Sequence, residues 1–194
     1  EVPIETAITK AEVGYKVLGA NRDLAGVELA IAEQDGREFI LREALKEIEH
    51  SFDYIIVDCA PSLSLITVNA LAAVDSVLIP MQCEYYALEG LADLTQTIDR
   101  IQQALNPDLQ ITGVLRTMYD ARNALTRDVS EELEQYFGKK LYDTVIPRNV
   151  RLAEAPAHGL PIIYFEKNSK GAVAYLNLAA EVLKKSKVKK GIKA

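Results

Sequence analysis

The stretch from Phe52 to Ser62, FDYIIVDCAPS, constrains the fold more than any other part of this chain. Its apolar run, Tyr54 to Val57, contains no polar alternation, which is typical of a strand buried on both faces of a parallel sheet. The run ends on Asp58, and a Cys-Ala-Pro turn follows. Because open α/β sheets bind ligands beyond the carboxyl ends of their strands, the sequence predicts that Asp58 lies at a ligand-binding edge.

An acid in this position is typical of the Walker B carboxylate of a P-loop nucleotidase, which holds Mg²⁺ directly or through water. The alternative is a structural role, in which Asp58 caps the helix that follows Pro61 and Ser62. No GxxxxGK[ST] sequence occurs in the 194 residues. The phosphate-binding loop that such an enzyme needs is therefore not in this chain.

Strand-like and helix-like segments alternate along the chain. Strands are expected at 15–18, 54–58, 76–81, 110–117 and 141–146, an extended segment at 161–164, and helices at 37–50, 64–74, 87–105, 125–137 and 169–183. Such alternation implies right-handed βαβ crossovers. We therefore predict an α/β fold with a mostly parallel sheet flanked by helices, P-loop NTPase-like and incomplete at its N-terminus.

The composition, 49% hydrophobic and 26% charged, is ordinary for a globular domain. No apolar run approaches the ~20 residues that span a bilayer. The two cysteines, Cys59 and Cys83, are too few for a disulfide framework, and we expect both to be small buried residues. The net charge of −6 argues against wholesale attraction to nucleic acid, and the C-terminal lysines are expected to form a solvated tail rather than a binding arm.

Five segments together resemble the ParA/Soj chromosome- and plasmid-partitioning ATPases: FDYIIVDCAPSLSLITVNAL, VLIPMQCEYYALEGL, GVLRTMYDAR, TVIPRNVRLAEAP and SKGAVAYLNLA. The similarity is collinear from about Tyr15 to Leu183. The resemblance implies an ATP-driven dimerisation switch that binds DNA non-specifically and is stimulated by a ParB-type centromere-binding protein. It also implies a bacterial or archaeal protein of the cytoplasm and nucleoid that does not bind membranes.

In that family, a deviant Walker A loop and a DxD-containing strand precede the region matched here. We therefore expect the C-terminal portion of such an ATPase, with residues 1–14 as a linker, 15–185 as part of the ATPase domain and 186–194 as a basic tail. ATP and Mg²⁺ are the implied cofactors of the complete protein. Neither is expected to be ordered on this chain, which alone is not expected to hydrolyse ATP.

The missing neighbour has a structural consequence, because the family's P-loop strand lies beside the strand that here ends at Asp58. Without that neighbour, Tyr54–Val57 would present an unpaired sheet edge. We expect the chain to pair that edge with another chain, to rearrange, or to be marginally stable.

The resemblance also assigns roles to residues outside the Walker B position. It implies a Mg²⁺-associated role for Asp58 and a nucleotide-sensing, dimer-facing role for Gln82 and Glu84, with packing by Tyr85 and Tyr86 as the alternative reading of that segment. The residues implied for an adenine pocket are Thr117, Met118, Pro147, Arg148 and Asn149. For Met118 the alternative is a place in the core.

Non-specific DNA binding is implied for Arg122 and Arg151, and Lys170 could extend the same face. Arginine suits phosphate because its planar donor fork is permanently charged. The alternative is a surface ion pair of each arginine, with Asp120 or with Glu154.

Other readings compete with a partition ATPase. A MinD-like cell-division ATPase would end in an amphipathic membrane-seeking helix, but beyond Leu183 the chain offers only Val188 and Ile192 as large apolar residues. An iron–sulfur ATPase would need cluster-facing cysteines, for which Cys59 and Cys83 lie in the wrong contexts. A non-catalytic DNA- or protein-interaction domain is the alternative from a different class.

Overall fold

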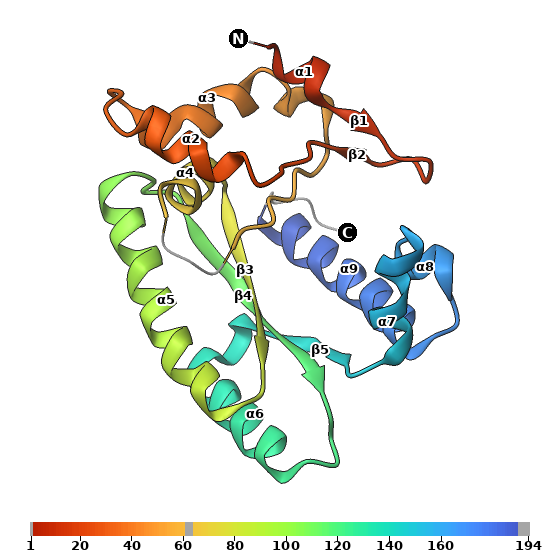
Figure 1. Ribbon diagram of the computed structural model, residues 1–194. Coiled ribbons are helices and arrows are strands. Elements are labelled where there is room, and N and C mark those ends of the chain that lie inside the picture. The colour runs from red at the N-terminus through yellow and green to blue at the C-terminus, as the bar shows by residue number, and fades with distance from the viewer. Residues whose placement is uncertain (1, 61–63, 190–194) are drawn as a thin grey trace. The chain divides into compact units, whose positions relative to one another are not determined.

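The computed structural model describes residues 2–60 and 64–189 (Figure 1). The chain divides into two compact units. Unit 1 comprises Glu1–Ser76 and Gln96–Gln110, and unit 2 comprises Val77–Thr95 and Ile111–Ala194.

Unit 1 is built mainly from short helices and one small hairpin. Its elements are α1 (Ile4–Ala7), β1 (Thr9–Lys10), β2 (Lys16–Val17), α2 (Leu24–Ile31), η1 (Arg37–Phe39), α3 (Ile40–Lys46), η2 (Glu49–Ser51) and α4 (Leu65–Ala73), together with the C-terminal part of α5 (Tyr85–Ala104). The strand expected at 15–18 is present as β2, which pairs antiparallel with β1. The helix expected at 37–50 is present as α3 flanked by two 3₁₀ turns.

A buried amide organises the helices of unit 1. Asn69 Oδ1 accepts a hydrogen bond from the Leu41 N–H (3.1 Å), while Asn69 Nδ2 donates to the carbonyls of Arg37 (2.7 Å) and Leu65 (3.0 Å). A buried polar group must find such partners, because an unsatisfied one costs free energy. One side chain therefore joins the start of α3 to α4.

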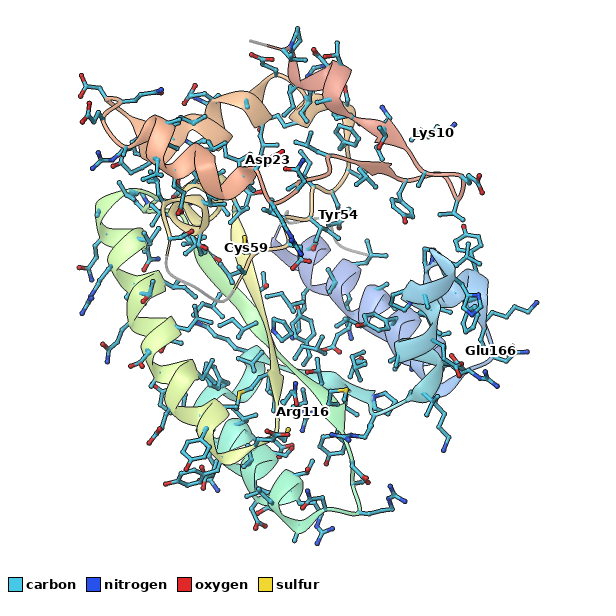
Figure 2. The ribbon with its side chains drawn as sticks, in the orientation of Figure 1. Lys10, Asp23, Tyr54, Cys59, Arg116 and Glu166 are labelled. Carbon is cyan, nitrogen blue, oxygen red and sulfur yellow. The ribbon has the colours of Figure 1, made fainter. Side chains whose placement is uncertain are left out.

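The segment expected to be the central strand is not one. Residues 54–58 belong to no strand, and Ile56 is 90% exposed and Tyr54 51% exposed. Figure 2 labels Tyr54 and Cys59 on this segment. Strand formation requires hydrogen-bonded neighbours, and no strand in the described part of the chain pairs with these residues. The strand predicted at 54–58 is therefore wrong for this structure. Because this segment joins no sheet, the structure has no sheet edge at Tyr54–Val57 that could be paired or left open. Cys59 is also exposed, against expectation, whereas Cys83 is buried.

Unit 2 is organised around a parallel three-stranded sheet of order β3-β4-β5, which confirms the predicted α/β class (Figure 1). The strands are β3 (Ser76–Gln82), β4 (Gln110–Tyr119) and β5 (Leu141–Pro147). The helices and turns that follow β3 in the chain are α5 (Tyr85–Ala104), α6 (Ala124–Phe137), η3 (Gly138–Lys140), α7 (Val150–Glu154), η4 (Ala155–His158), α8 (Ile162–Phe165) and α9 (Lys170–Lys189).

One core cluster of unit 2 lies where α9 packs on the sheet. Its buried members come from β4, β5 and α9: Leu115, Tyr142, Ile146, Ala174 and Leu178. Gly113 allows the strands to approach, because a Cβ at this position would lie 2.7 Å from the Tyr142 ring and would collide with the Lys140 carbonyl. The glycine is thus required by close approach rather than by its backbone angles.

One further prediction is wrong. Residues 161–164 were expected to be extended, but Ile162–Phe165 form the short helix α8, with Pro161 at its N-cap. The carbonyl of Pro161 accepts hydrogen bonds from Tyr164 (2.9 Å) and Phe165 (3.0 Å). Proline is compatible with the start of a helix, where an N–H would have no intrahelical partner, so this segment carries a weak helix signal that its apolar run obscures.

Candidate functional site

The carboxyl ends of β4 and β5 carry the densest group of predicted site residues. The two strands pair in parallel, with Val114 opposite Leu141, Arg116 opposite Val145, and Tyr119 opposite Pro147. The register therefore shifts twice, because the two strands advance by different numbers of residues between these pairs. Such irregularities re-aim the backbone and are frequent beside binding sites.

The first irregularity lies in β5 and is held from two sides. Arg116 Nη2 donates to the Tyr142 carbonyl (3.0 Å). On α9, Glu181 accepts from the backbone N–H groups of Asp143 and Thr144, both at 3.0 Å. Backbone groups of β5 at this irregularity are therefore hydrogen-bonded by the side chains of Arg116 on β4 and Glu181 on α9.

The charge of Glu181 follows from the same contacts. Burial disfavours the carboxylate, but the amide hydrogen bonds from Thr144 and Asp143 outweigh it, so the pKa of Glu181 is lowered. Lys185, one turn further along α9, lies 3.4 Å from Glu181 and 3.7 Å from the centroid of the Tyr142 ring. Through these hydrogen bonds, which favour its ionised form, Glu181 joins α9 to β5.

The second irregularity centres on Met118 in β4. Met118 has φ 50°, the only positive φ of a non-glycine residue in the described ranges, and its side chain is 43% exposed. A left-handed backbone costs a residue with a Cβ about 1–2 kcal/mol. The side chain is not core filler, and the strained backbone turns it out at the end of the strand.

The two chain segments predicted to form an adenine pocket meet at this point. Tyr119 is the register partner of Pro147, and its carbonyl accepts a hydrogen bond from the Arg148 N–H (3.1 Å). Asn149 Oδ1 accepts from the Leu152 N–H (3.3 Å) and so begins α7. The structure thus brings together Thr117, Met118, Pro147, Arg148 and Asn149 at one end of the sheet.

A groove of about 410 Å³ adjoins this end of the sheet. Pro147 and Thr144 line it from β5, and Lys170 and Asn177 line it from α9. Lys170, predicted to contact DNA, therefore shares a groove with Pro147, predicted to contact adenine. This proximity has no signal in the sequence, where the two residues belong to different segments.

Both arginines predicted to contact DNA form the ion pairs named as the alternative. Arg122 binds Asp120 through Nε (2.9 Å to Oδ1) and Nη2 (2.8 Å to Oδ2), and its side chain is 90% exposed. These hydrogen bonds hold the pKa of Asp120 at about 2. Arg151 Nη1 lies 2.7 Å from Glu154 Oε2 on α7. Exposed pairs of this kind contribute little stability, so a phosphate can compete for either arginine.

Arg116 is a buried arginine that the sequence reasoning missed. Nη1 donates to Ser130 Oγ (2.6 Å) and to Glu134 Oε1 (3.0 Å), both on α6, while Nη2 reaches Tyr142. Figure 2 labels Arg116 within the sheet unit. The one available signal is a charged residue inside the otherwise apolar run GVLRT. Arg116 holds β4, α6 and β5 in one arrangement behind the strand ends.

The segment after β3 carries the predicted dimer-facing residues. Gln82 and Glu84 are exposed and flank the buried Cys83, in a tight turn where the Glu84 N–H donates to the Gln82 carbonyl (2.9 Å). Tyr85 and Tyr86 make an edge-to-face pair with centroids 5.5 Å apart, and they are 62% and 80% exposed. The packing alternative is therefore not realised for these tyrosines.

Asp58 lies in unit 1 and is exposed. It does not cap α4, because Ser64 Oγ accepts from the Thr67 N–H (3.4 Å) and Glu28 Oε1 accepts from the Ile66 N–H (3.1 Å). The described residues contain no group of three His, Cys, Asp or Glu side chains suited to a metal. A lone accessible carboxylate still fits Mg²⁺, which keeps several waters and binds proteins through one or two carboxylates plus substrate phosphates.

Across residues 2–60 and 64–189, no helix has the length and apolar character of a membrane span.

The parallel sheet flanked by helices has the predicted site residues at the ends of its strands, and its match to solved structures places it in the P-loop NTPase class. The sequence profile of the AAA domain family (AAA_31) matches residues 1–111. The chromosome partitioning protein ParA of Myxococcus xanthus is 51% identical over 184 residues, covering 94% of this chain and 65% of that protein. The sporulation initiation inhibitor protein Soj of Bacillus subtilis is 55% identical over 166 residues, covering 86% and 66%.

Among solved structures, a cobyrinic acid a,c-diamide synthase from Mycobacterium smegmatis with bound ADP and magnesium matches with a TM-score of 0.81. It is 35% identical, and the match covers 98% of this chain and 70% of that one. This chain belongs to the ParA/Soj family of chromosome-partitioning proteins, within the AAA domain family; it also covers 71% of the chromosome partitioning protein ParA of Caulobacter vibrioides at 45% identity. It spans about two thirds of the length of the ParA and Soj relatives.

Proposed function

We propose that this chain is part of an ATP-dependent partition switch and supplies its base-binding and DNA-binding surfaces. The observation that carries the proposal is the convergence of the β4 and β5 ends, where strained Met118 lies one residue before Tyr119, the partner of Pro147. Backbone strain persists only where the surroundings impose it, and it clusters at binding sites. The 51% identity to the chromosome partitioning protein ParA of Myxococcus xanthus supports the same role.

Two separate groups of residues are assigned to ATP and Mg²⁺ in the complete protein. Thr117, Met118 and the Pro147–Asn149 segment receive the adenine through backbone groups and a flat apolar surface. Asp58 orients hydrated Mg²⁺, which neutralises phosphate charge when bound. Because the sequence contains no GxxxxGK[ST] loop, the chain alone does not hydrolyse ATP.

DNA is bound non-specifically through phosphate contacts. Arg122 and Arg151 exchange their carboxylate partners for backbone phosphates, and Lys170 adds a third charge beside the base-binding end. Contacts of this kind position a protein on DNA without reading bases. The complete protein then associates with the nucleoid in the cytoplasm.

Assembly uses the segment after β3. Gln82 and Glu84 face a second copy of the complete protein, and the exposed Tyr85–Tyr86 pair offers rigid aromatic area beside them. A ParB-type protein stimulates the ATP-bound dimer. Residues 1–14 serve as a linker and 186–194 as a basic tail flanking the ATPase portion.

Calorimetry of ATP·Mg²⁺ binding tests the nucleotide part. It compares this chain, a version extended upstream to include a P-loop, and the extended version carrying Asp58→Asn. We expect tight binding only by the extended form, and a loss of Mg²⁺ dependence in D58N. Absence of binding by both lengths would refute the nucleotide proposal and favour an interaction domain that needs no ATP.

Binding of a short DNA duplex at several salt concentrations tests the second part. Arg122→Gln and Arg151→Gln should each weaken binding and reduce its salt slope by about one. Lys139→Gln is the matched control, because Lys139 is an exposed cation of η3 outside the proposed face. Equal losses for all three variants would indicate a diffuse charge effect and contradict this face.

A further inference from the structure

The hairpin of unit 1 places two like charges in register. Lys10 of β1 lies directly opposite Lys16 of β2. Like charges in directly opposed cross-strand positions destabilise a hairpin. Neither lysine forms an ion pair with a carboxylate within residues 2–60 and 64–189. No ion pair within the described residues therefore offsets this local cost.

Both lysines line one pocket. Its volume is about 160 Å³, and Ile8, Ile48 and Phe52 supply its apolar walls. Ser51 contributes a hydroxyl at the same pocket. The Lys16 ammonium lies 5.0 Å from the centroid of the Phe52 ring, a cation–π contact that orients it. Figure 2 labels Lys10 on the hairpin.

The geometry points to a binding site for a small phosphate-type anion between Lys10 and Lys16. Two ammonium groups and a hydroxyl can donate hydrogen bonds to phosphate oxygens. A bound dianion also offsets the repulsion between the two lysines. All the lining residues belong to unit 1, and none is among the residues proposed for nucleotide or DNA binding.

Glu5 also lines this pocket and makes the site testable. Its carboxylate repels an incoming anion, and it forms no ion pair with either lysine in the described part of the chain. Removing that charge should therefore tighten binding, whereas removing a lysine should weaken it. A nonspecific response to net charge would not depend on which side chain is changed.

The experiment titrates inorganic phosphate into the whole chain and follows the backbone amide shifts of Lys10, Lys16 and Ser51 by NMR. We expect saturable shifts at these residues, an affinity at least about tenfold weaker in Lys10→Gln, and a severalfold tighter affinity in Glu5→Gln. Lys46→Gln is the matched control, since Lys46 already pairs with Glu43 at 2.8 Å. It should leave the phosphate affinity unchanged.

Thermal unfolding of the same variants separates binding from folding. Lys10→Gln should unfold at the same or a higher temperature, because it removes a like-charge pair. If it unfolds at a lower temperature, Glu5→Gln decides the question, since that variant keeps both lysines. Unchanged affinity in Glu5→Gln, or shifts that are not centred on the hairpin, would overturn the proposal. So would a Lys10→Gln variant that weakens duplex DNA binding alone and leaves phosphate binding intact.

Discussion

Two apolar stretches have similar sequence patterns typical of strands, but only one of them forms a strand in this protein. In unit 1, Tyr54–Val57 stays out of any sheet, and Ile56 is 90% exposed. In unit 2, Val114 and Leu115 of β4 are 0% and 4% exposed. The second stretch has strand neighbours on both sides in the order β3-β4-β5, and the first has none among the described strands. An apolar run specifies that a segment can be a central strand, and its neighbours decide whether it becomes one.

The sharpest test of this comparison truncates one residue of each stretch. Leu115→Ala should lower the free energy of unfolding by about 2–5 kcal/mol, because it opens a cavity in the core formed with Tyr142 and Leu178. Ile56→Ala should change it by no more than about 0.5 kcal/mol, because the side chain is exposed. Urea unfolding measures both. A comparable loss in the two variants would mean that the Tyr54–Val57 run is buried in solution.

A glycine substitution tests how tightly the buried stretch is packed. Gly113→Ala should destabilise the protein by about 1–3 kcal/mol, since the new methyl group would meet the Tyr142 ring and the Lys140 carbonyl. Gly90→Ala, within α5 and with nothing inside 4 Å, should instead stabilise it by up to about 1 kcal/mol. Thermal unfolding gives the sign of each change, and a neutral Gly113→Ala would show that the strands separate more easily than the structure indicates.

A pH titration tests how the irregular β5 is held. The pKa of Glu181 is lowered in the folded state, so its ionised form contributes stability above the unfolded value of 4.5. That contribution should be lost as the pH falls through the lower, folded pKa. Glu181→Gln should cost about 1–2 kcal/mol at pH 7 and flatten the acid limb of the stability curve. An unchanged acid limb in Glu181→Gln would mean that groups other than Glu181 take up the protons that destabilise the fold at low pH.

The smallest expected effect concerns the backbone of Met118. Met118→Gly should stabilise the fold by about 0.5–1 kcal/mol, because glycine adopts φ 50° without strain. Met118→Ala keeps the unfavourable conformation and is the control. The same substitution is then made in the version extended upstream to include a P-loop. If Met118→Gly stabilises the fold but lowers the affinity of the extended version for ATP, the strained backbone is needed for adenine binding. If Met118→Gly destabilises the fold, the contacts of the Met118 side chain contribute more stability than its left-handed backbone conformation costs.

Much of the fold follows from local patterns. The strands at 76–81, 110–117 and 141–146 and the helices between them lie within two residues of their observed bounds. The helices α2 and α7 were not predicted. The error at residues 161–164 has a local cause, since a single helical turn after proline lacks the length that makes periodicity informative.

The candidate site was only partly visible in the sequence. Motif resemblance selected the residues of the β4 and β5 ends, and the parallel pairing brings them together. The left-handed Met118, the buried Arg116 and the groove shared by Pro147 and Lys170 carry no comparable local signal. Each depends on contacts between segments that are distant in the chain.

The sequence by itself determined the family, the α/β class, and the order and type of most elements, because these depend on motifs and on hydrophobic periodicity over a few residues. The tertiary structure decided that Tyr54–Val57 lies outside the sheet, that Lys10 lies opposite Lys16, and that Glu181 fastens α9 to β5. The physical reason is that strand pairing, burial and ion pairing are properties of two partners. A one-dimensional pattern describes only one of them.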